Sequence, residues 1–137
     1  MIQNQFNDVY DFHKKFDCSI GEKPAVPPAE IELLALRLVN EEFKELSDAL
    51  AARDLPEIAD AIADLIYVLN GMAIRYGIYL PDVWAEVHRT NMAKIGGGAD
   101  AGGKIKKPAG WTPPDIAAIL RYQWSIQQEI SVADVVS

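Results

Sequence analysis

The sequence has 137 residues, of which 50% are hydrophobic and 24% are charged, and its formal net charge is −7 at pH 7. This length suffices for one domain with a hydrophobic core, and the acidic balance argues against binding of nucleic-acid polymers through a basic surface. The single cysteine, Cys18, excludes an intrachain disulfide. No apolar run approaches the roughly 18–20 residues of a membrane span, and the N-terminus has no secretory signal pattern. We therefore expect residues 1–137 to form one soluble cytoplasmic domain without membrane contacts.

The N-terminal part of the chain is predicted to be a short helix followed by a linker. Residues 3–17 are expected to be helical, because apolar side chains and His13 recur on one face at helical spacing. We interpret His13 as a half-buried histidine at the edge of the core rather than as a ligand. Residues 17–28 are predicted to be a linker, because prolines and a glycine interrupt helical structure there.

Two long helices are predicted next, at residues 29–53 and 56–76. The first is apolar on two sides, which indicates burial on two sides, both within a bundle and against a second subunit. Asp54 is suited to cap the second helix, and Pro56 is tolerated in its first turn. Because the break between the helices is short, they are expected to pack antiparallel.

The C-terminal part is predicted to contain two further helices, at residues 81–94 and 113–123. Between them, residues 95–110 are rich in glycine and lysine and are expected to form a mobile loop. Residues 124–137 are expected to be weakly ordered. No strand-like alternation of useful length is present, so the fold class is all-α, a helical bundle with its core at about residues 29–123.

Six carboxylates interrupt the apolar pattern of the two long helices. Antiparallel packing about a turn near residue 54 or 55 places Glu45 opposite Asp64, with Glu42 one turn above. Asp60 lies about 6 Å along its helix from Asp64. The six residues are Glu41, Glu42, Glu45, Glu57, Asp60 and Asp64.

The acids of the second long helix, Glu57, Asp60 and Asp64, lack nearby basic partners on that helix, since no Lys or Arg occurs between Arg53 and Arg75. Burial of carboxylates without a counter-charge is costly, so the cluster indicates bound cations. Oxygen ligands without histidine or cysteine favour Mg²⁺, or alternatively Mn²⁺, over zinc. The competing interpretation is a set of solvated acids on an acidic surface.

The segment Glu41-Glu42-Phe-Lys-Glu45, followed by Asp64-Leu-Ile-Tyr, resembles the MazG-like all-α nucleoside triphosphate pyrophosphohydrolases. This superfamily includes phosphoribosyl-ATP pyrophosphohydrolases and dimeric dUTPases, and the resemblance covers roughly residues 30–115. It implies Mg²⁺-dependent cleavage of a nucleoside triphosphate to the monophosphate and pyrophosphate. Glu42, Glu45 and Asp64 carry over as metal ligands, and Glu41 as a further ligand or as the group that orients the attacking water.

One position departs from the family pattern. The glutamate expected three residues before Asp64 is replaced by Ala61, and the acid stands one position earlier, at Asp60. We take Asp60 as the substitute ligand and rank Glu57 below it.

The resemblance also suggests nucleotide contacts at Asn91 and Lys94, on the helix predicted at residues 81–94. Lys107 and its neighbours on the glycine-rich loop are candidates to close over the phosphates. Trp111 is a candidate to stack on the base, whereas Trp84 is interpreted as a core residue.

The predicted function is hydrolysis of a (deoxy)nucleoside triphosphate, with dUTP or a non-standard nucleotide as candidates, in cleansing of the nucleotide pool. The predicted partner is a second copy of the chain, in a homodimer or homotetramer. Two alternatives remain: hydrolysis of phosphoribosyl-ATP in histidine synthesis, and a non-catalytic helical module that binds metal or a basic partner. The sequence leaves the base preference and the number of metal ions open.

Overall fold

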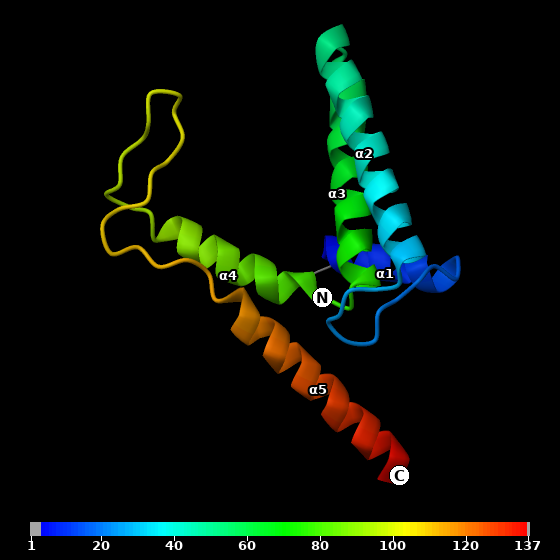
Figure 1. Cartoon of the computed structure of the whole chain (residues 1–137). Coiled ribbons are helices and arrows are strands. Elements are labelled where there is room, and N and C mark those ends of the chain that lie inside the picture. Colours follow the sequence, from blue (N-terminus) through cyan, green and yellow to red (C-terminus); the bar gives the residue numbers. More distant parts are fainter. Residues whose placement is uncertain (1–3, 137) are drawn as a thin grey trace.

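The computed structural model describes residues 4–136, with side-chain environments up to residue 126, and this part of the chain is all-helical (Figure 1). No helix in it is long and apolar enough to cross a membrane. The predicted all-α fold class is confirmed. The helices are α1 (Gln5–Lys15), α2 (Ala29–Ala52), α3 (Leu55–Arg75), α4 (Leu80–Met92) and α5 (Ile116–Val136).

Helices α2 and α3 form a long antiparallel pair and lie side by side in Figure 1. Arg53 adopts the left-handed backbone conformation, with φ of 53°, and ends α2. The side chain of Asp54 then accepts a hydrogen bond from the backbone N–H of Glu57 at 3.3 Å and starts α3. This tight reversal fixes the register of the two helices.

The hydrophobic core lies at the lower end of this pair, where α1 packs against α3. Phe6 and Val9 of α1 are buried against Ala73 and Ile74 of α3. His13 is buried as well, with 3% of its surface exposed, and its Nδ1 lies 2.8 Å from the carbonyl oxygen of Ser19. His13 is thus more deeply buried than the half-buried position at the core edge that was predicted.

The linker between α1 and α2 is bonded to the end of α3. The backbone N–H of Gly21 donates to the Ile74 carbonyl at 2.8 Å, and that of Ala25 donates to the Tyr76 carbonyl at 3.0 Å. Gly77, with φ of +67°, lies so close to the linker that a Cβ atom there would be 2.2 Å from the Lys23 carbonyl oxygen. Backbone therefore passes directly against backbone at this crossing.

Helices α4 and α5 extend away from the α2–α3 pair (Figure 1). The Gln123 amide joins them: its Oε1 accepts from the Tyr79 N–H at 3.0 Å, and its Nε2 donates to the Tyr79 carbonyl at 2.9 Å. Helix α5 continues to Val136, so the expected end near residue 123 was wrong. The segment after Ile116 has neither glycine nor proline to end a helix.

The loop between α4 and α5 projects from the far end of α4 (Figure 1). The carboxylate of Asp100 accepts hydrogen bonds from the N–H groups of Gly102 and Lys104, each at 2.9 Å. Ala99 and Ile105 pair across the loop as an isolated antiparallel bridge. The glycine-rich segment is therefore a folded-back loop with its own hydrogen bonds.

Large apolar side chains remain exposed on the single chain. Leu36, Phe43 and Leu50 form the second apolar stripe of α2, and they are 49%, 60% and 55% exposed. Trp84 is 69% exposed, so its interpretation as a core residue was wrong for the single chain. Within the part of the chain whose side chains are described, no element covers this apolar stripe.

Candidate metal centre

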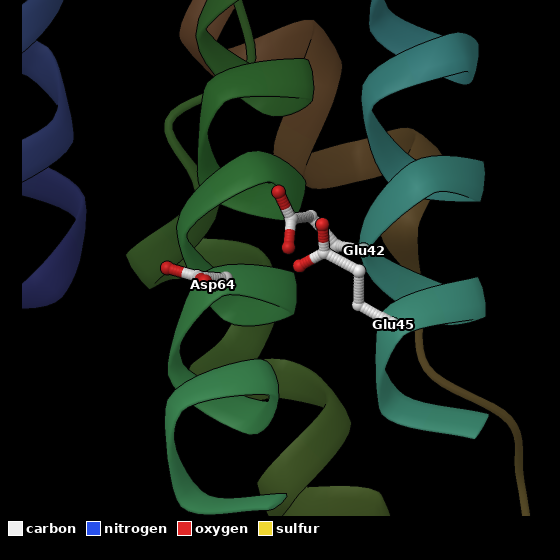
Figure 2. A group of neighbouring side chains, drawn as sticks. All are labelled: Glu42, Glu45 and Asp64. Carbon is white, nitrogen blue, oxygen red and sulfur yellow. The ribbon is translucent and has the colours of Figure 1, made fainter. Parts of the chain in front are cut away.

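Three of the predicted carboxylates meet between α2 and α3. Glu42 and Glu45 extend from α2 toward α3, and Asp64 lies on α3 beside them (Figure 2). Each offers an oxygen atom, and these three atoms lie within 4.8 Å of one another. This is the spacing that oxygen ligands around one small cation require.

Small side chains are buried along the α2–α3 pair. The buried positions of α2 are Ala35 and Ala49, and Ala61 is buried on α3. Alanines at a helix contact allow the axes to approach closely, so that the longer acidic side chains span the space between them. Ala61, where the family pattern expects a glutamate, thus lies at a buried position of α3.

The centre carries uncompensated negative charge. Burial raises the pKa of the Glu42 carboxyl above its ordinary value, and the charges of Glu45 and then Asp64 raise it further. Burial likewise raises the pKa of Asp64, followed by the charge of Asp60. Within the described part of the chain, no ion pair involves Glu42, Glu45 or Asp64.

One atom of the centre lacks a partner. The Oε2 atom of Glu42 is buried and receives no hydrogen bond from any residue that the structure describes. A buried acceptor without a donor is unfavourable in proteins. An all-oxygen donor set with an unpartnered buried oxygen fits a hard divalent cation such as Mg²⁺ or Mn²⁺.

The remaining predicted acids lie around this group. Asp60 is close enough to Asp64 to raise its pKa, although it is not one of the three that converge. Glu41 is exposed, and its carboxylate lies 3.7 Å from Nε of Arg37. Glu57 is exposed and contributes its backbone N–H to the cap of α3. Their roles as ligands or bases stay predictions.

The predicted nucleotide-contact residues gather elsewhere, where α4 meets its following loop. Trp111 donates its indole N–H to the Thr90 carbonyl at 2.7 Å. The Nζ atoms of Lys94 and Lys107 lie 5.4 and 4.9 Å from the centre of its ring. Asn91 is exposed on the last turn of α4. Within one chain, these residues lie at the end of α4 that points away from the α2–α3 pair (Figure 1).

A groove that was not predicted from the sequence runs between α1 and α3. Its volume is about 290 Å³, and its lining includes Asp8, Tyr67 and Asn70. Asn70 is 7% exposed, and it is the one amide side chain within the apolar run of α3. The asparagine within this apolar run is the sequence feature that could have indicated the groove, because buried polar groups need hydrogen-bond partners.

The comparisons with known proteins agree with the resemblance in the sequence. A family model described as Phosphoribosyl-ATP pyrophosphohydrolase matches residues 9–91, more than half of the chain. This interval contains α2, α3 and the three converging carboxylates. A 47-residue stretch, 34% of this chain, is 47% identical to an uncharacterised protein of Acanthamoeba polyphaga mimivirus and covers 19% of that protein.

Proposed function

Because the chain belongs to the phosphoribosyl-ATP pyrophosphohydrolase family, we propose that it cleaves a nucleoside triphosphate to the monophosphate and pyrophosphate. Family membership indicates activity of the pyrophosphohydrolase type. The observation that carries the proposal is the convergence of Glu42, Glu45 and Asp64, with a buried and unpartnered oxygen on Glu42. Negative charge that no basic side chain of the protein neutralises is what a site requires if it binds a metal ion together with a polyphosphate.

Glu42, Glu45 and Asp64 would hold Mg²⁺ or Mn²⁺, with Asp60 at the edge of the site. The bound metal would supply charge neutralisation of the phosphates and activation of the attacking water. The water oxygen forms a bond to one of the two phosphorus atoms that share the α–β bridging oxygen, and the bond from that phosphorus to the bridging oxygen breaks. Glu41 or Glu42 accepts the proton that the water releases.

Glu42 and Glu41 suit different parts of this role. Glu42 is one of the converging carboxylates, so it would lie beside a water that the metal holds. Glu41 is solvent-exposed at the edge of the cluster, and its carboxylate lies 3.7 Å from Nε of Arg37. We assign proton acceptance to Glu41 or Glu42, in addition to the role of Glu42 as a metal ligand.

We further propose that the active form is a homodimer or homotetramer. The exposed stripe of Leu36, Phe43 and Leu50 supports this, because contiguous apolar surface of this kind marks interaction sites. A second copy would also bring positive charge to the carboxylates, since Lys94 and Lys107 lie away from them within one chain.

The substrate proposed is a (deoxy)nucleoside triphosphate, with dUTP or a non-standard nucleotide among the candidates. Phosphoribosyl-ATP presents the same α–β phosphate linkage to the same carboxylates and is the competing substrate. A non-catalytic module that only binds metal is the third possibility.

Release of pyrophosphate from a panel of these nucleotides, with Mg²⁺ or Mn²⁺, distinguishes the three. We expect Glu45→Gln to lower turnover by at least about a hundredfold, because a ligand to the metal is lost. Glu30→Gln, at an exposed position in the first turn of α2, is the matched control and should retain activity. Equal turnover by Glu45→Gln and wild type, or no pyrophosphate from any nucleotide, would refute the proposed function.

A further inference from the structure

A buried arginine at the end of α3 has no acidic partner. Arg75 is 8% exposed. Within residues 4–126, whose side chains are described, the side chain of Arg75 makes neither an ion pair nor a hydrogen bond. Its guanidinium group stays protonated in proteins, so the positive charge cannot be lost. A buried charge without a counter-charge is unfavourable, and Arg75 therefore indicates a bound anion.

Arg75 lines a small cavity at the place where α1, α2 and α3 meet. The volume of this cavity is about 60 Å³. Helix α1 contributes His13 to its wall, α2 contributes Ala35 and Leu38, and α3 contributes Gly71 together with Arg75. One buried water needs roughly 10–15 Å³, whereas pockets for organic ligands begin at roughly 300 Å³. The cavity therefore has room for one small ion with water, and it is too small for a nucleoside.

His13 is the second group at the cavity that can carry positive charge. Its Nδ1 lies 2.8 Å from the Ser19 carbonyl oxygen, which only accepts, so Nδ1 carries a hydrogen. Burial lowers the pKa of His13, the hydrogen bond with Ser19 raises it, and the charge of Arg75 lowers it. The positive charge of Arg75 therefore reaches the imidazole ring, and an anion beside Arg75 would act on both groups.

No carboxylate lines the cavity in the described part of the chain. Its remaining titratable side chain is Tyr67 of α3, and burial, followed by the charge of Asp8, raises the pKa of this hydroxyl. Helix α2 contributes no titratable group to the wall. The Glu32 carboxylate, near the start of α2, accepts a hydrogen bond from the Tyr76 hydroxyl at 2.8 Å. The counter-charge for Arg75 must therefore enter from solution.

We propose that this cavity binds one small monovalent anion, such as chloride, between the guanidinium group of Arg75 and the imidazole of His13. Guanidinium N–H groups bind anions through charge-assisted hydrogen bonds. His13 adds a second donor when its Nε2 takes up a proton. The anion joins α1 to α3 and thereby stabilises the packing of the N-terminal helix. This inference goes beyond the proposed function, because it requires neither the metal nor a nucleotide.

The first test measures stability as bromide replaces gluconate at constant ionic strength and constant Mg²⁺ concentration. Above the dissociation constant, each tenfold rise in bromide should lower the unfolding equilibrium constant of wild type about tenfold. Arg75→Met, which keeps an unbranched side chain without charge, should lose this dependence. Arg121→Met, at an exposed position on α5, is the matched control and should keep it. Equal bromide dependence of Arg75→Met and wild type, or none in wild type, would overturn the proposal.

The second test follows the two histidines of the chain by NMR. His88 is exposed on α4 and serves as the internal control for His13. The pKa of His13 should be higher in bromide than in gluconate, because the anion offsets the charge of Arg75. The pKa of His88 should be the same in both salts. Equal shifts of the two histidines would show a general salt effect and would refute the site.

The third test locates the ion in wild type and needs no variant, so it also decides the question if Arg75→Met does not fold. Crystals are soaked in bromide, which gives an anomalous scattering signal. We expect a bromide peak within hydrogen-bond distance of the Arg75 guanidinium group, at the side that faces His13. Water alone at this position, in crystals that hold bromide elsewhere, would contradict the proposal.

Discussion

At the scale of single residues, Glu42 has surroundings that are unfavourable for a carboxylate. Its carboxylate is held near two other carboxylates, and one of its oxygens is buried without a donor. Sequence spacing predicted the proximity of Glu42, Glu45 and Asp64, because helical periodicity and an antiparallel turn determine which side chains face one another. The spacing did not predict the unpartnered oxygen of Glu42, because the burial of a single atom depends on how closely the neighbouring side chains pack.

The surroundings of Glu42 lead to a prediction about stability. Since the pKa of Glu42 is raised in the folded state, the folded protein retains a proton at pH values where the unfolded chain has released it. Without metal, the free energy of unfolding should therefore decrease as pH rises above about 4.5, the ordinary value for this group. Glu42→Gln should reduce this decrease and leave the part that comes from the raised pKa of Asp64, and in EDTA at pH 7 it should melt at a higher temperature than wild type.

Addition of Mg²⁺ provides the complementary measurement. Metal at about 100 times its dissociation constant should stabilise wild type by about 2.7 kcal/mol, and Glu42→Gln by clearly less. Glu30→Gln serves as the control for removal of one negative charge from α2. Equal stabilisation of both variants by Mg²⁺ would show that Glu42 is not a ligand.

At the scale of elements, the short break between α2 and α3 determines the register of the site. Asp54 caps α3 through the N–H of Glu57, so Asp54→Ala should cost about 1 kcal/mol of unfolding free energy in urea. Asp48→Ala, which breaks only an exposed pair with Lys44 at 2.9 Å, should cost less than about 0.5 kcal/mol. A loss for Asp54→Ala that is no larger than the loss for Asp48→Ala would contradict the capping role.

The limits of the helices could be predicted from the sequence, whereas contacts between distant segments could not. Asp54, Pro56 and Gly77 act through their own backbone and their neighbours, so the limits of α2 and α3 were predicted within one residue or two. The exposure of Trp84 and the position of Trp111 depend on segments distant in sequence. Helical spacing around Trp84 is the same whether the covering element belongs to the same chain or to another copy.

At the scale of the whole molecule, acidic and basic groups lie on different parts of the chain. The carboxylates are between α2 and α3, and Lys94 and Lys107 surround Trp111 beyond the end of α4. If a second copy supplies the lysines, neither Glu45→Gln nor Lys107→Ala should be active alone. An equal mixture, after dissociation and reassembly, should regain about a quarter of wild-type turnover, because half of the dimers contain one intact site.

This mixing experiment has a clear contrary result. If each chain builds its own site, both mutations inactivate their own chains and the mixture stays inactive. Two Glu45→Gln samples mixed in the same way control for changes caused by reassembly itself. A mixture without activity, from variants that each form native oligomers, would refute the shared site.

The crossing of the linker over the end of α3 has a consequence for reading mutational data. A Cβ atom at Gly21 would lie 2.4 Å from the Gly77 nitrogen, and one at Gly77 would lie 2.2 Å from the Lys23 carbonyl oxygen. Since backbone atoms cannot yield as a flexible side chain can, both glycines should tolerate no replacement. In a saturation screen for activity they would score like catalytic residues, although they lie at the opposite end of α3 from the segment that contains Asp60 and Asp64. Only a parallel screen for abundance would distinguish loss of chemistry from loss of folded protein.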